Sequence, residues 1–306
     1  GKATWGALVE AHAERTHEGE FIAAFNNGRA LLRASDGLRG RTPLRVEWKG
    51  PHRDPADNAV PADLRIDHVY LVSCKYLSKV LHNASPWALF ERCLAGSPNR
   101  KGDDWFEEVA PAQHQAHYDS VRRLLDGGEK LPLRVGGLDA DQRRMLATAR
   151  EVTSHESATA YAELADAVAV ESARRWSNQL RTRTQQRSML WRLLRLSATP
   201  YFVLGTGAGE NLRIRVATPW DWNQVWELLT LDIEAVPAGQ PVVAWRAEVR
   251  RRTEVTDDDP AGLRSDREVR GHVEIRWSHG RFGGSPEAKV YLDSPHGEVP
   301  GYIALR

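Results

Sequence analysis

Two short segments carry an acid and a base at a spacing that could support phosphodiester chemistry. Asp63 stands just before the alternating stretch 64–66, and Lys75 ends the segment 69–75, which follows after a tight turn. If the two segments are adjacent antiparallel strands, Asp63 and Lys75 meet at the same end of a sheet. A carboxylate there can hold a hard divalent cation, and an ammonium group can orient water or stabilise a pentavalent phosphate. Metal-assisted phosphodiester hydrolysis needs both groups.

This order of elements resembles the PD-(D/E)xK nuclease superfamily, which includes many restriction enzymes. In that order, a helix is followed by an Asp on a strand and then by a strand that ends in x-x-Lys. The family pattern begins with a helix glutamate, and Glu10, Asp63 and Lys75 match its positions in this chain. Ser73 departs from the pattern, because the family usually has an acid at that position. The resemblance covers roughly residues 5–95 and implies an α/β fold, a restriction-endonuclease-like mixed sheet flanked by helices.

Some restriction enzymes of the superfamily carry Ser-x-Lys and take the missing carboxylate from the next helix. Ser85 and Pro86 are suited to begin such a helix, and Glu91 follows them. The resemblance therefore implies Asp63 and Glu91 as ligands of Mg²⁺ or Mn²⁺.

The remaining catalytic roles also come from the resemblance. Lys75 would assist the attacking water, Ser73 would hydrogen-bond water or phosphate, and Glu10 would support the site from the first helix. The structural alternative stays open: Asp63 caps a turn, Lys75 is a solvated strand end and Glu91 lies on the surface.

Two other Glu-x-Lys triplets compete with this site. Residues 47–49 lie on an expected strand without a preceding strand Asp, although Glu47 could stand near the metal from the neighbouring strand. Residues 287–289 follow a polar loop, and no helix follows them. Neither triplet has the surroundings that the nuclease pattern requires.

Basic residues suggest how the chain could bind nucleic acid. Seven of the 42 basic residues are Lys and the others are Arg, whose planar guanidinium suits bidentate phosphate recognition. Candidates for contact with double-stranded DNA are Arg181 on an Arg-rich helix, Arg276 and Arg281 around a glycine turn, and Lys289. An ordinary hairpin and a solvated helix face are the structural alternatives, and the net charge of +1 does not by itself mark a nucleic-acid binder.

Composition narrows the class of protein. With 306 residues, 41% apolar and 27% charged, the chain is suited to one large or two modest globular domains. No apolar run approaches the length of a membrane span, and two cysteines do not make a disulfide scaffold. Residues 1–20 show several acids and no apolar leader, so a cytoplasmic location is expected.

Periodicity predicts the order of the elements. We expect a helix over 3–34, strands over 44–48, 64–66 and 69–72, and helices over 104–126 and 139–195. Strands over 201–204 and 212–216, a short helix over 220–231 and an all-β part after 241 should follow. The expected organisation is a nuclease-like core over 1–96, a helical insertion over 97–199, core elements over 200–236 and a β-rich region over 237–306.

The function expected from these observations is a metal-dependent endonuclease that hydrolyses DNA. A restriction or phage-defence role is what the resemblance implies. Two alternatives stay open: a non-catalytic DNA-binding or assembly module with a degenerate nuclease fold, and a nuclease that acts on RNA. A homodimer is one assembly compatible with such a chain.

Overall fold

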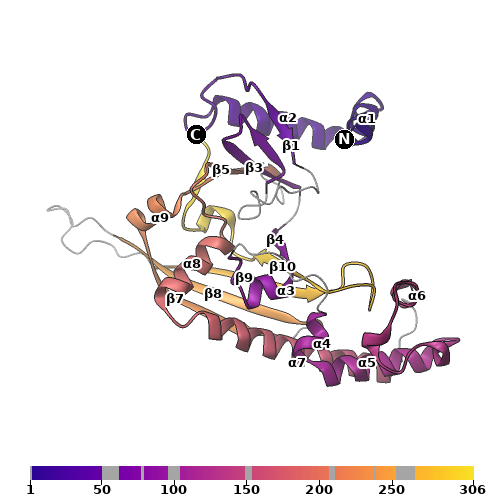
Figure 1. The fold of residues 1–306 in the computed structure, drawn as a ribbon. Helices are drawn as coiled ribbons and strands as arrows, with labels where there is room; N and C mark the ends of the chain where they lie inside the picture. The colour runs from indigo at the N-terminus through magenta and orange to yellow at the C-terminus, as the bar shows by residue number, and fades with distance from the viewer. Residues whose placement is uncertain are drawn as a thin grey trace. The chain divides into compact units, whose positions relative to one another are not determined.

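The computed structural model describes residues 2–49, 62–76, 79–95, 104–148, 154–206, 211–236, 239–252 and 266–306. The chain forms two compact units, whose elements can be followed in Figure 1. Unit 1 contains 1–79, 195–224 and 296–306, and unit 2 contains 80–194 and 225–295. Both units combine helices with a sheet, which confirms the α/β class. The four-part division expected from the sequence stays a prediction.

Unit 1 is built on a mixed six-stranded sheet. Its strands have the order β1-β2-β3-β5-β6-β11, and only the β3–β5 pair is parallel. Their bounds are β1 Val46–Trp48, β2 Leu64–Ile66, β3 Tyr70–Tyr76, β5 Tyr201–Thr206, β6 Asn211–Val216 and β11 Tyr302–Ala304. The strands expected near 46, 65, 71, 203 and 214 are therefore present. A segment of more than 100 residues separates the parallel neighbours β3 and β5.

The first expected helix is two helices, α1 (Lys2–Ala13) and α2 (Glu18–Arg33). The break lies at 14–17, where Arg15 and His17 adopt a left-handed backbone with φ of 57° and 61°. Gly19 and the stretch 26–28 lie within α2. Helix α2 covers one sheet face, because its Leu31 packs in a core cluster with Leu38, Ile66, Val72, Phe202 and Leu204.

Unit 2 is built on an antiparallel five-stranded sheet with the order β4-β10-β9-β8-β7. The bounds are β4 Val80–Ala84, β7 Trp226–Ala235, β8 Val242–Arg251, β9 Asp266–Arg276 and β10 Glu287–Leu292. Strand β4 was not expected. The helix expected over 220–231 is wrong beyond α9 (Pro219–Val225) of unit 1, because Trp226 and Leu228 are buried on either side of exposed Glu227. That alternation favours a strand.

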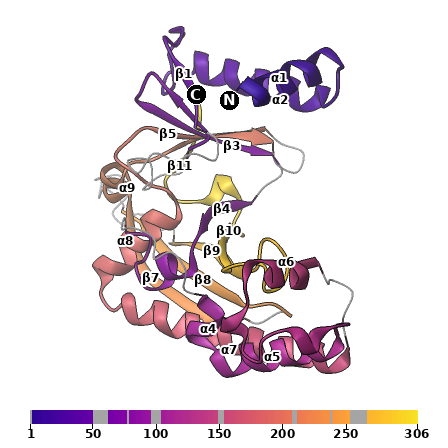
Figure 2. The same cartoon turned by 45° about the vertical axis from the view of Figure 1, so that its right-hand side comes forward.

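Six helices complete unit 2 among its described residues. They are α3 Pro86–Phe90, α4 Trp105–Val109, α5 Pro111–Leu124, α6 Ala140–Thr148, α7 His155–Gln179 and α8 Arg183–Leu193. Helix α7 runs along one face of the sheet, as Figures 1 and 2 show. The helix expected to continue to 195 breaks after Gln179, because Thr182 and Gln185 form a capping box that begins α8. None of the described helices is both long and apolar enough to cross a membrane.

Candidate functional site

Asp63 and Lys75 come from neighbouring antiparallel strands of unit 1. Leu64 of β2 pairs with Val72 of β3, so Asp63 lies beside Ser73 at the end of the pair where β3 reaches Lys75. Oδ2 of Asp63 accepts hydrogen bonds from the Cys74 backbone N–H at 2.6 Å and from the Ser73 hydroxyl at 3.3 Å. The exposed Asp63 carboxylate is thus fixed against the strand that carries Lys75.

Side chains alternate along β3 and divide it between two faces of the sheet. Val72 packs into the core beneath α2. Ser73 points the other way, where its hydroxyl accepts a hydrogen bond at 3.2 Å from Nη1 of Arg195. Lys75 shares the Ser73 face by the same alternation. The candidate site therefore belongs to the sheet face opposite α2.

Arg195 is a buried cation on this face, with only 6% of its surface exposed. Its Nη1 also donates to the Tyr201 hydroxyl, and its guanidinium lies over the Tyr201 ring. Its Nε is buried and has no hydrogen-bond partner among the described residues. Buried Tyr302 has a raised pKa because of desolvation, which nearby Arg195 partly offsets. A buried cation requires such polar neighbours to offset its desolvation.

His296 adds a titratable group to the same face of unit 1. It begins the short 3₁₀ turn His296–Glu298, and its ring stacks on Tyr302 with centroids 6.1 Å apart. Partial burial lowers the pKa of His296, and the charges of Lys75 and Lys79 lower it further. Basic side chains therefore surround the Ser73–Lys75 segment, and that arrangement favours anions such as phosphate.

Sequence reasoning overlooked Arg195 and His296 as members of this group. Arg195 was expected at the end of the helix over 139–195, whereas it lies beyond the end of α8 with a φ of 60°. No sequence motif includes His296. The parallel pairing of β3 with β5 brings Arg195 and Tyr201 beside Ser73, and no local pattern encodes that pairing.

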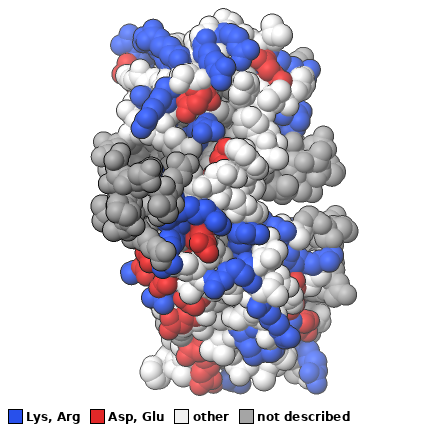
Figure 3. Space-filling view, turned by 90° about the vertical axis from the view of Figure 1, so that its left-hand side faces the viewer, with Lys and Arg blue, Asp and Glu red and all other residues white. Residues whose placement is uncertain are grey.

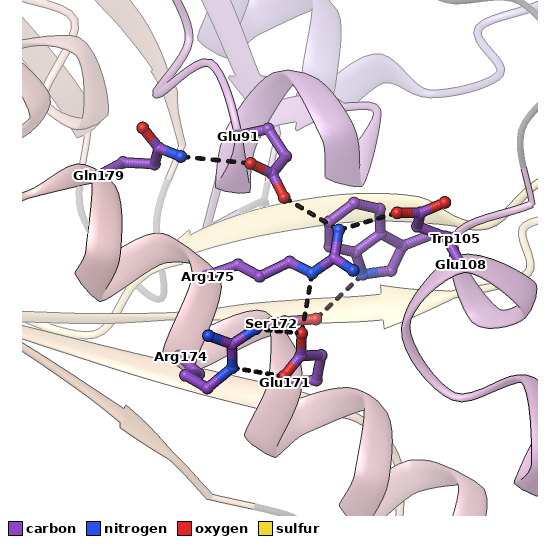
Figure 4. Close-up of polar contacts among 8 residues, drawn as sticks. All are labelled: Glu91, Trp105, Glu108, Glu171, Ser172, Arg174, Arg175 and Gln179. Carbon is purple, nitrogen blue, oxygen red and sulfur yellow. Dashed lines mark hydrogen bonds and ion pairs between the residues drawn. The ribbon is translucent and has the colours of Figure 1, made fainter.

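Glu91 belongs to unit 2, where basic and amide side chains hold it (Figure 4). It does not lie on α3 as expected but is the C-cap residue after Phe90, although Ser85 caps the start of α3 as predicted. The Glu91 carboxylate accepts from Arg175 Nη1 at 3.0 Å and from Gln179 Nε2 at 3.2 Å. Its pairing with Asp63 as a metal ligand stays a prediction.

Arg175 connects three carboxylates of unit 2. Besides Glu91 it contacts Glu108 at 3.0 Å and Glu171 at 2.9 Å, and it lies over the Trp105 ring (Figure 4). Hydrogen bonds from Arg174 and Arg175 lower the pKa of Glu171 to about 2. The cluster binds α3, α4 and α7 together, which is a structural role.

The two other expected acids differ in their surroundings. Glu47 of β1 is half-buried and pairs with Arg65 at 2.8 Å, Arg45 at 3.0 Å and His68 at 3.4 Å. The hydrogen bond from Arg65 contributes most to a lowered Glu47 pKa. Glu10 is exposed on α1. Its supporting role stays a prediction.

The expected DNA-contacting residues lie in unit 2. Arg276 pairs with Glu274 at 3.3 Å, the Arg281 guanidinium lies over the Tyr161 ring, Lys289 faces Glu274 across the β9–β10 pair, and Arg181 is exposed. Figure 3 shows Lys and Arg side chains gathered in patches on one face, with Asp and Glu between them. DNA contact by these four residues stays a prediction.

The glycine turn after β9 is packed against other parts of unit 2. Phe282 is fully buried among Tyr118, His114, His117 and Trp277. Gly280 has a φ of +92°, and a Cβ there would lie 2.4 Å from the Ala147 carbonyl oxygen. The turn needs glycine because it approaches α6 closely.

Comparison with protein-family models, curated proteins and solved structures found no match to this chain. Within the described ranges, no group of three or more His, Cys, Asp or Glu side chains is placed to hold a metal ion. The Asp63–Lys75 strand pair and its surroundings are therefore the candidate functional site.

Proposed function

We propose that unit 1 is a divalent-cation-dependent phosphodiesterase that acts on DNA. One observation carries the proposal: Asp63 contacts Ser73 and Cys74 at the strand end that carries Lys75. An acid and a lysine on adjacent strands are the groups that the expected chemistry requires.

The single carboxylate at this strand end matches the smallest set of protein ligands that Mg²⁺ uses. Mg²⁺ is commonly bound through one or two carboxylates, with water and substrate phosphate as the other ligands. Asp63 would hold it, and no contact to its Oδ1 is found among the described residues. Bound Mg²⁺ would supply Lewis-acid polarisation of a phosphate oxygen.

The other side chains would bind and orient the phosphate. Lys75 would place its ammonium group toward the charge that develops on the phosphate. Ser73, held by Asp63 and Arg195, fixes the strand on which Lys75 stands. Lys79 would add positive potential, which favours approach of a polyanion such as DNA, whereas its lowered pKa keeps the His296 ring uncharged near pH 7.

A second function, a DNA-binding module without catalysis, is supported by the surroundings of Glu91. Its negative charge is balanced by Arg175, and such a carboxylate is a poor additional ligand for a metal. With Asp63 as the single acid, cation affinity could fall below what hydrolysis requires. The same basic face would then bind the phosphate backbone only.

Cleavage of supercoiled plasmid DNA with Mg²⁺ separates the two functions. The wild type should nick or linearise the plasmid, and Asp63→Asn should not, because the amide keeps the hydrogen bonds but loses the charge. Asp232→Asn is the matched control, since Asp232 is exposed on β7 of unit 2. Equal cleavage by Asp63→Asn would refute the catalytic proposal. A wild type that retards plasmid DNA without cutting it would establish the second function.

A further inference from the structure

The orientation of α2 about its axis is fixed by a buried polar contact with the sheet of unit 1. Nδ2 of Asn27 donates to the Gly205 carbonyl at 3.0 Å, and its Oδ1 accepts from Arg213 Nε at 2.9 Å. Leu31, one turn further along α2, is buried in the core. The helix face opposite Asn27 and Leu31 must therefore point away from the sheet.

That outward face carries large apolar groups. Phe25 is 77% exposed and Ile22 is 56% exposed, and their spacing places them on one stripe. The exposed stripe consists of Glu18, Ile22, Phe25, Arg29 and Arg33. Helix α1 meets the start of α2, where the ring centroids of His12 and Phe21 lie 5.1 Å apart, and Ile22 and Phe25 stay exposed. Two large exposed apolar side chains that lie side by side, bordered by charged residues, are typical of a contact with another molecule.

A groove accompanies the stripe. It has a volume of about 440 Å³ and is lined by Phe21, Ala24, Phe25, Gly28, Arg29 and Leu32. A Cβ built on Gly28 would meet no atom within 4 Å, so its surface is open. The groove can therefore accept an apolar side chain from a partner helix.

The charges on the stripe identify the partner. Glu18 stands at its beginning, whereas Arg29 and Arg33 stand at its end. Two copies of α2 packed antiparallel about a two-fold axis at Phe25 would place Ile22 of each copy over Gly28 of the other. Glu18 would then lie within one turn of the basic end of the other copy. We propose that a second copy of this chain docks on α2 and forms a symmetric dimer.

Helix α1 enlarges the surface available to this dimer. Trp5, Leu8 and Val9 are all about half exposed or more, at 67%, 48% and 50%. A stable interface buries on the order of 800 Å² on each partner, which is more than one 16-residue helix face supplies. We therefore expect a dimer that dissociates in the micromolar range and strengthens when α1 takes part.

Sedimentation velocity over a range of concentrations tests the dimer. The wild type should show a reversible monomer–dimer equilibrium, and Phe25→Ser should raise its dissociation constant by about tenfold or more. Phe25 is exposed, so the variant should keep the wild-type circular dichroism and melting temperature. Trp220→Ser, which removes a side chain that is 70% exposed on α9, is the control and should leave the equilibrium unchanged.

Charge reversal tests the antiparallel orientation. Glu18→Arg and Arg33→Glu should each weaken the dimer several-fold, because each creates like-charge contacts across the two-fold axis. The double variant should recover most of the wild-type affinity. A protein that stays monomeric at all concentrations, or a double variant weaker than both single variants, would overturn the proposal.

Discussion

Asp63 in unit 1 and Glu91 in unit 2 are acids of the same class that the structure holds in opposite ways. A backbone N–H and a hydroxyl, both neutral, hold Asp63. A guanidinium and an amide hold Glu91, and the guanidinium balances its charge. Neutral donors orient a carboxylate and leave its charge available to a cation. The contrast supports the proposed role in chemistry for Asp63, and a role in stability for Glu91.

The largest expected effect is on catalysis in unit 1. Lys75→Ala should lower Mg²⁺-dependent plasmid cleavage by about 10²–10³-fold, because it removes the ammonium group that would face the phosphate. Folding should be unaffected, since Lys75 is only partly buried at a strand end. Lys130→Ala, an exposed lysine of unit 2, is the control. Undiminished cleavage by a folded Lys75→Ala protein would show that Lys75 has no role in cleavage.

Acid should destabilise unit 2 through two buried histidines. Burial among aromatic rings lowers the pKa of His114 to about 4 and that of His117 to about 3. The unfolded chain binds protons below about pH 6.5 that folded unit 2 does not bind, so its free energy of unfolding decreases as the pH falls toward 4. The slope should be about 1.4 kcal/mol per pH unit for each histidine.

Chemical denaturation at several pH values, followed by tryptophan fluorescence, measures this loss. His117→Phe should be less sensitive to acid than the wild type, because its ring nitrogens, which have no hydrogen-bond partner among the described residues, are removed. His155→Gln, at the exposed start of α7, should behave like the wild type. An unchanged pH slope in His117→Phe would contradict buried histidine as the cause of the acid sensitivity.

Glu91→Gln sharpens the comparison of the two acids. We expect it to lower the free energy of unfolding by about 1 kcal/mol, because Glu91 and Arg175 are each 23% exposed and solvent screens the pair in part. Glu156→Gln removes half of a more exposed pair with Arg123 and should cost less. Plasmid cleavage should continue in Glu91→Gln. Loss of plasmid cleavage in Glu91→Gln would support Glu91 as a metal ligand instead.

The smallest effect concerns DNA affinity through unit 2. Arg276 and Arg281 are engaged with Glu274 and the Tyr161 ring, so replacing both with Ala should weaken DNA binding only a few-fold. The slope of log affinity against log salt should decrease by about 1 for each lost phosphate contact. Arg144→Ala, on exposed α6, is the control. An unchanged slope would leave these residues with a structural role.

Sequence patterns predicted the elements that are determined by residues close together in the chain. Ser85 and Pro86 begin α3 as expected, and the alternation over 64–66 and the short apolar run over 69–72 predicted β2 and β3. One stretch whose apolar residues fit both a helix and a strand was assigned to the wrong element. Trp226 and its successors were read as helix because their apolar residues also fit a helical spacing, whereas pairing with β8 makes them a strand.

Contacts across long sequence separations could not be predicted. Arg195 reaches Ser73 across 122 positions, and Arg175 reaches Glu91 across 84. Each depends on the order of strands or helices in its unit, which no single motif specifies. The sequence therefore pointed to Asp63 as an acid of the candidate site, which stays a prediction, but no local pattern pointed to the groups that hold it.

Crystals soaked in Mn²⁺ test the central claim most directly, because the anomalous signal locates the ion without an activity assay. Our account predicts Mn²⁺ at a distance of about 2.0–2.6 Å from a carboxylate oxygen of Asp63, and none at Glu91. The peak should disappear in Asp63→Asn. A peak at Glu91 alone, or no peak at Asp63 in crystals of active protein, would contradict the account.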